Sequence, residues 1–243
     1  MDWQLRPARD LGLDRGERML SLARERGLVA LGANGVWRRL LRAYLRLAHG
    51  LEVTGREHLP EPPFVMIANH ASHLDALTLA ASLRGEAARQ AHALAAGELF
   101  FGSGAGAAFS AYAINALPIW RGRTRAGDMR MLRARLVEDR MVYILFPEGT
   151  RSRTGEMAPF QGGLAALVAG TGAKVVPCWL DGAHAAWPPD RKWPRPGKLK
   201  LAIGAPIASS DYAADAAGKL ALTDACREAV IALRPISAGS RTS

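Results

Sequence analysis

The chain has 243 residues, of which 49% are hydrophobic, so it can bury a full core and its composition excludes a largely disordered protein. Its 32 basic residues outnumber its 22 acidic ones, and the net charge of +10 indicates anionic partners: a phospholipid surface, a phosphorylated substrate, an acidic carrier protein or nucleic acid. Cys178 and Cys226 lack the spacing of a zinc site or a disulfide framework, which fits a reducing compartment.

The N-terminal segment, residues 1–50, carries ten arginines against five acidic residues, which is half of the chain's excess positive charge. Over residues 36–49, apolar residues recur at helical spacing: Trp37, Leu40, Leu41, Tyr44, Leu45 and Ala48. The other positions hold Arg38, Arg39, Arg42 and Arg46. This pattern predicts a basic amphipathic helix, which either lies among phospholipid headgroups or packs on the core as an ordinary surface helix. We expect residues 1–50 to be a helical membrane-docking segment.

Two further patterns bear on location. The first residues lack a basic region followed by an apolar stretch, so we expect no secretory signal and a cytoplasmic protein held at the inner face of the cell membrane. Residues 99–120 carry no formal charge over a length that could span a bilayer, but they contain several Gly and Ser residues, an Asn and a Pro. Their low hydrophobicity favours a buried helix leading into a strand.

After Gly50, short apolar runs alternate with helical stretches. Strands are predicted over 64–68, 92–96, 116–119, 142–146, 174–180 and 198–203. Helices are predicted over 73–84, 98–114, 126–139, 162–170 and 217–234. This alternation predicts an α/β fold in which a mixed central sheet is flanked by helices. We expect one domain over residues 51–236 and a flexible tail over 237–243.

The stretch Asn69-His70-Ala71-Ser72-His73-Leu74-Asp75 directly follows the first of these strands. On one regular helix, His70 and Asp75 would not share a face, so the pair requires His70 in the turn before the helix, where Asn69 and Ser72 are good capping residues. A carboxylate on one imidazole nitrogen leaves the other nitrogen able to take a proton from a hydroxyl. Two alternatives remain open: a histidine that only caps the helix, and His73 as the base. The spacing does not match known zinc motifs, so no metal is expected.

A second polar stretch, Phe146-Pro147-Glu148-Gly149-Thr150-Arg151-Ser152-Arg153, follows the strand predicted over 142–146. Gly149 lets the backbone turn sharply, and Arg151 can bind a phosphate through two N–H groups. Glu148 either holds the arginines in place or touches hydroxyls of a substrate, while the alternative for the whole stretch is a solvated ion-pair turn. Nucleotide-binding and nucleic-acid-binding motifs are absent from the sequence, so neither partner is predicted.

Four ordered blocks resemble the glycerolipid acyltransferases, and most of all the lysophosphatidic acid acyltransferases. The blocks are Asn69-His70-x-Ser72-x-x-Asp75, Leu117-Pro118-Ile119-x-Arg121, Phe146-Pro147-Glu148-Gly149-Thr150-Arg151-Ser152 and Val175-Val176-Pro177. The resemblance extends from about Leu51 to Ile207.

The resemblance implies an O-acyltransferase of phospholipid biosynthesis that uses acyl-CoA or acyl carrier protein as co-substrate and needs no cofactor. His70 would be the general base, oriented by Asp75, and the acceptor would be a lysophospholipid, first of all 1-acylglycerol 3-phosphate. Its glycerol phosphate would be held by Arg121, Glu148, Gly149, Thr150 and Arg151, with Pro177 shaping the wall of the site.

The chain departs from the family pattern in three places. Asn115 stands where the second block often begins with Gly, Trp120 precedes the Arg of that block, and Gln161 follows Phe160 where many members have a basic residue. These departures concern the acceptor side and leave another lysolipid, such as an amino-acid-linked lipid, as an alternative acceptor. Two further alternatives are a non-catalytic module that binds anionic lipid and a hydrolase in which water replaces the lipid hydroxyl.

Overall fold

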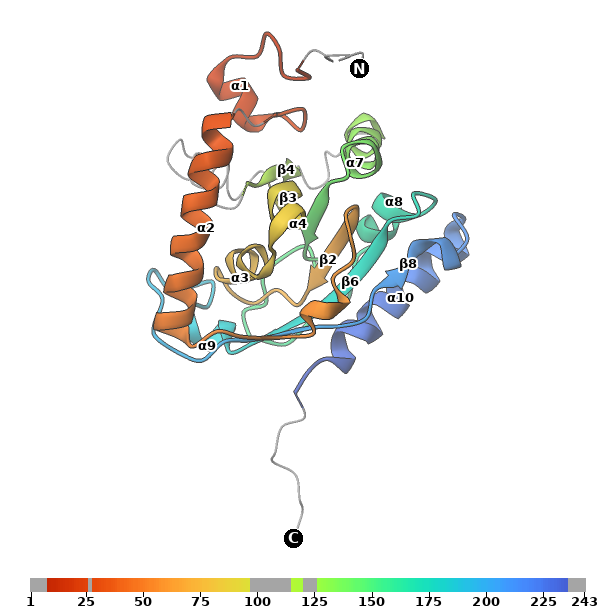
Figure 1. The fold of residues 1–243 in the computed structure, drawn as a ribbon. Coiled ribbons are helices and arrows are strands. Elements are labelled where there is room, and N and C mark those ends of the chain that lie inside the picture. The colour runs from red at the N-terminus through yellow and green to blue at the C-terminus, as the bar shows by residue number, and fades with distance from the viewer. Residues whose placement is uncertain (1–7, 26–27, 97–114, 120–125, 236–243) are drawn as a thin grey trace.

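The computed structural model describes residues 8–25, 28–96, 115–119 and 126–235, drawn in colour in Figure 1. The helices in these ranges are α1 (Arg15–Leu20), α2 (Leu28–His49), α3 (Asp75–Ser82), α4 (Gly85–Gln90), α7 (Ala126–Glu138), α8 (Gly163–Val168), α9 (Ala183–Ala186) and α10 (Ala216–Ala232), with short 3-10 turns η1 (Arg56–His58) and η2 (Ser209–Asp211). The strands are β1 (Glu52–Thr54), β2 (Phe64–Ala68), β3 (Ala91–Ala96), β4 (Leu117–Ile119), β5 (Val142–Leu145), β6 (Lys174–Asp181), β7 (Lys200–Ile203) and β8 (Ile207–Ala208).

The strands form one sheet of mixed direction, in the order β1-β7-β6-β2-β5-β3-β4, with β8 also paired to β6. β6, β2, β5, β3 and β4 run parallel, whereas β7 and β8 run antiparallel to β6. This arrangement confirms the predicted mixed α/β sheet. The register aligns Ile67 of β2 with Leu145 of β5, so both central strands end at the same edge of the sheet.

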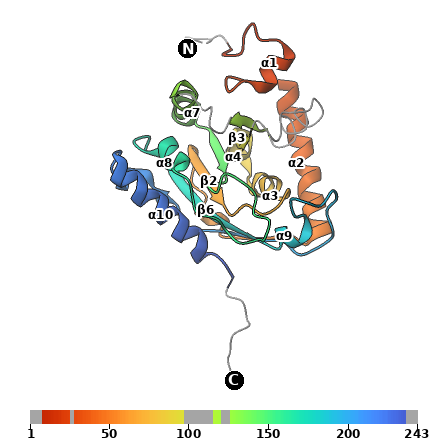
Figure 2. The same cartoon turned by 180° about the vertical axis from the view of Figure 1, so that it is seen from behind.

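Helices cover both faces of the sheet, as Figures 1 and 2 show from opposite sides. In β2, Phe64, Met66 and Ala68 point to one cluster of buried residues, while Val65 and Ile67 point to the other. α2, α3 and α4 contribute to the first cluster, and α7, α8 and α10 to the second. Because both faces are covered, all five residues of β2 are buried, which explains why this strand is a continuous apolar run.

α2 has two different faces, which the sequence pattern did not separate. Leu41 and Leu45 are buried in the core on the face that contacts α3, whereas Leu40 and Tyr44 are exposed. Arg38 was expected on the polar face but is buried, because its Nε donates to Asn34 Oδ1 at 2.7 Å and its Nη1 donates to the Ala80 carbonyl oxygen at 3.2 Å. Burial lowers the pKa of Arg38 to about 10.

Hydrogen bonds from buried arginines connect the segment before α2 to the edge of the sheet and to α7. Arg24 Nη2 donates to the carbonyl oxygen of Ala116 at 2.6 Å, just before β4. Arg135 of α7 donates to the carbonyl oxygens of Leu22 and Arg24. These bonds satisfy backbone oxygens that would otherwise be buried without donors. Residues 22–24 therefore lie against β4 and α7.

Within the described ranges, every helix is too short or too polar to cross a bilayer. The helix predicted over 98–114 lies outside those ranges, as does most of the uncharged stretch 99–120.

Candidate active site

The loops that follow β2 and β5 meet at one edge of the sheet, as their common register requires. The loop after β2 carries His70, and α3 begins at Asp75. The loop after β5 carries Glu148 and Arg151. A direct bond joins the two loops, since the backbone N–H of Ser152 donates to the His70 carbonyl oxygen at 2.7 Å.

His70 and Asp75 form the hydrogen-bonded pair that their spacing predicted. The distance from His70 Nδ1 to Asp75 Oδ2 is 2.8 Å, and the same oxygen accepts the backbone N–H groups of Ala71 and Ser72, each at 2.8 Å. Asp75 is buried, so three donors replace water around its carboxylate. An acidic partner on Nδ1 selects the tautomer in which Nδ1 carries the proton and Nε2 presents a lone pair.

The plane of the His70 ring is set by an aromatic neighbour. The ring stacks on Phe146, with 4.0 Å between centroids and an interplanar angle of 13°. The His70 side chain is 15% exposed, and its Nε2 has no hydrogen-bond partner in the part of the chain that the structure describes. This nitrogen is thus available to a ligand at the sheet edge.

Glu148 is buried against the same loop rather than directed at a cation. One carboxylate oxygen accepts the backbone N–H of His70 at 2.6 Å, and the other accepts the backbone N–H of Ala158 at 2.7 Å. Burial raises the pKa of Glu148 above its usual range, and the two N–H bonds oppose that shift. Glu148 and Ser152 thus hold the backbone of His70 on both sides, at its N–H and at its carbonyl oxygen.

His73, the other candidate base, has different partners. Its Nδ1 lies 2.6 Å from Arg151 Nη1, and its ring packs against Trp187 with 4.9 Å between centroids. Its Nε2 lies 2.8 Å from the same Arg151 nitrogen and 3.4 Å from the Pro189 carbonyl oxygen. Burial lowers the pKa of His73, and the Arg151 charge lowers it further. His73 is therefore held neutral beside Arg151 instead of being paired with Asp75.

Replacing Arg151 with methionine is expected to raise the pKa of His73, because it removes the neighbouring positive charge while burial remains. A histidine pKa below its unfolded value also makes stability depend on pH. The contribution of His73 is complete above the unfolded pKa of about 6.5 and is lost as the pH falls to the folded value, since only the unfolded chain then binds the proton. An NMR titration of the His73 ring proton in both proteins measures the shift. An equal pKa in the two proteins would contradict the pairing.

The remaining predicted site residues are placed as follows. Gly149 has a φ of 74°, a left-handed backbone conformation that favours glycine. Thr150 is exposed beside it. Pro177 is buried in β6, level with Ile67 of β2, next to the last residue of that strand. Arg121 lies outside the described residues.

Two residues of the first block do more than the sequence indicated. Asn69 was expected to cap the helix, but its side chain bridges β2 to β6, donating to the Leu180 carbonyl oxygen at 3.0 Å and accepting the Leu180 N–H at 2.8 Å. Ser72 Oγ donates to the Trp187 carbonyl oxygen at 2.7 Å and accepts the N–H of Leu74. Asparagine and serine signal such side-chain bonds to backbone, but only the fold identifies their partners.

Two of the departures from the family pattern have structural roles. Asn115 has a φ of 51°, a left-handed conformation that glycine and asparagine tolerate, and its Nδ2 donates to the Ala91 carbonyl oxygen at 2.8 Å. Gln161 folds back on the turn of the third block, where its Nε2 donates to the Glu148 carbonyl oxygen at 3.2 Å. Both side chains are thus engaged with the protein backbone. Trp120 lies outside the described residues.

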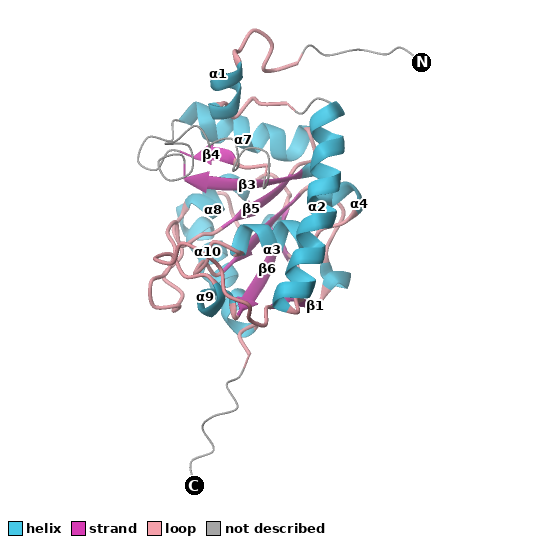
Figure 3. Cartoon of the chain, turned by 90° about the vertical axis from the view of Figure 1, so that its left-hand side faces the viewer, coloured by secondary structure: helices cyan, strands magenta, loops and turns pink. Residues whose placement is uncertain are grey.

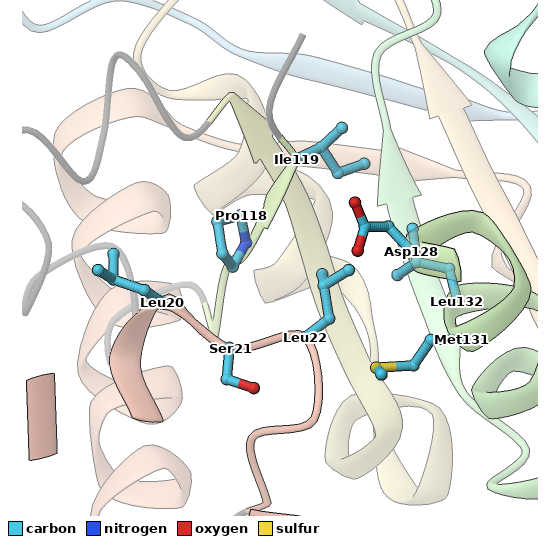
Figure 4. A pocket seen from close by; sticks show the side chains of 8 residues that line it. All are labelled: Leu20, Ser21, Leu22, Pro118, Ile119, Asp128, Met131 and Leu132. Carbon is cyan, nitrogen blue, oxygen red and sulfur yellow. The ribbon is translucent and has the colours of Figure 1, made fainter. Parts of the chain in front are cut away.

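A separate pocket of about 260 Å³ lies away from His70, between the segment after α1, β4 and α7, as Figure 4 shows. It is lined by Leu20, Ser21, Leu22, Pro118, Ile119, Asp128, Met131 and Leu132. The lining includes no residue of the His70 or Glu148 loops, so this pocket is distinct from the His70–Asp75 pair. Among the described residues, no group of three potential metal ligands comes together.

Comparisons with known proteins place this geometry in context. The family described as Acyltransferase matches residues 50–181. The chain is 30% identical over 174 residues to a 1-acyl-sn-glycerol-3-phosphate acyltransferase of Bacillus subtilis, covering 71% of this chain and 81% of that protein. It is 27% identical over 204 residues to the mouse alpha enzyme of the same name, covering 80% and 68% of the two chains.

Other matches are shorter or show the fold alone. The coconut 1-acyl-sn-glycerol-3-phosphate acyltransferase is 35% identical over 77 residues, and the matched part is only 25% of that protein's length. The crystal structure of a 1-acyl-sn-glycerophosphate acyltransferase from Thermotoga maritima superimposes with a TM-score of 0.65 at 23% identity, covering 88% of this chain and 81% of that one.

Proposed function

The chain belongs to the acyltransferase family, and we propose that it transfers a fatty acyl group from a thioester to the free hydroxyl of a lysophospholipid. The observation that carries the proposal is the His70–Asp75 pair, in which Nδ1 is bonded to a buried carboxylate and Nε2 is available. The names of the relatives support 1-acylglycerol 3-phosphate as the acceptor, which would give phosphatidic acid.

The proposed chemistry follows from the tautomer of His70. Nε2 removes the proton of the acceptor hydroxyl while its oxygen attacks the thioester carbonyl carbon, and the resulting imidazolium is stabilised by Asp75. The tetrahedral intermediate then collapses with cleavage of the carbon–sulfur bond. The imidazolium returns its proton to the departing thiolate of coenzyme A or the carrier protein. His70 thus ends the cycle neutral, and the acyl group is never attached to the protein.

The acceptor phosphate is proposed to bind at Arg151, with Arg121 as a second cation. Arg151 is partly exposed at the same sheet edge as His70, and its Nη1 contacts the His73 ring. A guanidinium group can bind phosphate oxygens through two parallel N–H groups. The Asn115 and Gln161 side chains bind backbone groups, so neither of these two departures supports an amino-acid-linked acceptor.

We also propose that α2 contacts an anionic phospholipid surface. Val36, Leu40, Tyr44 and Leu47 form an exposed stripe along one side of the helix, and Leu47 is 86% exposed. The exposed side chains of Arg39 and Arg46 lie along one edge of this stripe, an arrangement suited to binding anionic headgroups. In Figure 3, α2 is in the foreground of the flank that faces the viewer.

Purified protein is expected to release thiol from acyl-CoA or acylated carrier protein only when a lysophospholipid is present, with diacyl product formed in equal amount. Arg151→Met is expected to raise the KM for lysophosphatidate by about 10- to 100-fold with a smaller effect on the donor KM, because a charged hydrogen bond to phosphate is lost. Assays against a panel of lysolipids with both donor types measure each value. Arg153→Met, two residues away and exposed, is the matched control.

Free fatty acid in place of diacyl product would instead identify a hydrolase, and no thiol release with any lysolipid would identify a binding module. An unchanged acceptor KM in Arg151→Met would contradict the phosphate site while leaving the transfer reaction itself intact.

A further inference from the structure

The loop between α9 and β7, residues 187–199, combines an exposed indole with a cluster of cations. Trp193 is 70% exposed, the highest exposure of any aromatic side chain in the part of the chain that is described. The loop carries the basic residues Arg191, Lys192, Arg195 and Lys198 against one acidic residue, Asp190. An indole held in solvent costs hydrophobic free energy unless something covers it.

Bonds at both ends hold this loop in place. The indole N–H of Trp187 donates to the Arg191 carbonyl oxygen at 2.9 Å, and the Arg195 N–H donates to the Ala186 carbonyl oxygen at 2.8 Å. Farther on, the Gly197 carbonyl oxygen lies 3.2 Å from His49 Nδ1 at the end of α2. Trp193 therefore projects from a loop whose two sides are tied to the fold.

The same loop borders the catalytic residues. Its first residue, Trp187, accepts hydrogen bonds from Ser72 Oγ and from the N–H of His73, at 2.7 Å and 3.3 Å. Its other end lies beside the C-terminal end of α2, and Figures 1 and 2 show loop and helix on one flank of the molecule. A surface that met both elements would lie next to the loop that carries His70.

We infer that the loop around Trp193 is a second membrane contact, which inserts its indole among anionic phospholipid headgroups and presents the His70 site to lipid-borne acceptor. The inference rests on the proposed function, since only a lipid acceptor requires the site to open at a membrane. Indole rings favour the boundary between headgroups and acyl chains, and flanking cations bind lipid phosphates. α2 exposes an apolar stripe on the same flank. This favours a membrane, which is an extended surface with both apolar and anionic groups, over a small acidic protein as the partner.

Flotation of the full chain with vesicles of equal parts phosphatidylcholine and phosphatidylglycerol tests the inference. Trp193→Ala and the double variant Lys192→Ala with Arg195→Ala are each expected to weaken binding by about 10-fold. The effect of the double variant should be larger at low salt, because salt screens charges. Leu220→Ala on α10 and Lys174→Ala at the start of β6 are matched controls, because both residues are exposed and lie on other elements. Leu40→Ser with Leu47→Ser tests α2 in the same assay.

Turnover separates this inference from the proposed function. With a short-chain lysophosphatidate kept monomeric, Trp193→Ala is expected to match the wild type, whereas with acceptor in vesicles its turnover should fall as its binding falls. Vesicle binding of Trp193→Ala equal to that of the wild type would overturn the inference. So would normal vesicle binding combined with lost turnover on acylated carrier protein alone, which would assign the loop to that protein. Absence of turnover by the wild type would reject the proposed function without changing the binding result.

Discussion

Replacing His70 with alanine is expected to lower kcat for acyl transfer by about 10²- to 10⁴-fold, the range that a positioned general base contributes. The acceptor hydroxyl would keep its proton during attack, because His73, the other histidine of this loop, contacts Arg151 and is not paired with Asp75. The substrate KM values should change little because the imidazole is proposed to act on the reacting hydroxyl alone. Steady-state rates of thiol release and of diacyl product, measured together, give both quantities.

The controls for this variant separate chemistry from folding. Vesicle binding and the thermal midpoint should stay near the wild-type values, because Asp75 keeps the N–H groups of Ala71 and Ser72 when the imidazole is removed. His58→Ala removes a histidine that is bonded to the Ile203 carbonyl oxygen in another part of the fold and should retain full activity. Turnover by His70→Ala within 10-fold of the wild type would falsify the assignment of the base.

The central strands of the sheet could be predicted from apolar runs in the sequence. Residues 64–68 form β2 as predicted, because a strand covered on both faces must be apolar at every position. The short strands β1 and β8 were not predicted from the sequence. β1 has three residues and β8 has two, so neither is long enough to show a period, and each exists through its pairing with β7 or β6.

Spacing was sufficient to predict the hydrogen bond between His70 and Asp75 and insufficient to predict the contacts around it. His70 and Asp75 are close in sequence, and a turn between strand and helix has few ways to join them. The bonds of Glu148 to His70 and of Ser152 to the same peptide cross from one loop to another, so they depend on the neighbouring positions of β2 and β5. The two faces of α2 were likewise indistinct, because a helix with apolar residues on more than half of its circumference does not reveal which stripe meets the core.

The buried carboxylate of Glu148 yields the second large effect, because we propose that it positions His70 instead of binding substrate. Glu148→Gln is expected to lower kcat by about 10- to 100-fold and leave the acceptor KM within about threefold, since one glutamine group must face a backbone N–H as a donor and leave it unpaired. The His70 peptide then loses the contact that fixes the base.

If Glu148 instead bound the acceptor, Glu148→Gln would raise the acceptor KM and change kcat little. Two measurements reach beyond kinetics in Glu148→Gln. The amide proton of His70 should move upfield in the NMR spectrum when its bond to a carboxylate is lost, and the thermal midpoint should fall by about 2 to 10 °C, as expected for about 1 to 3 kcal/mol. Glu156→Gln changes an exposed carboxylate of the same loop and should match the wild type in all of these. If the His70 amide resonance did not move and the acceptor KM rose, Glu148 would be assigned to acceptor binding. A carboxylate that only binds substrate hydroxyls would not affect the backbone of His70.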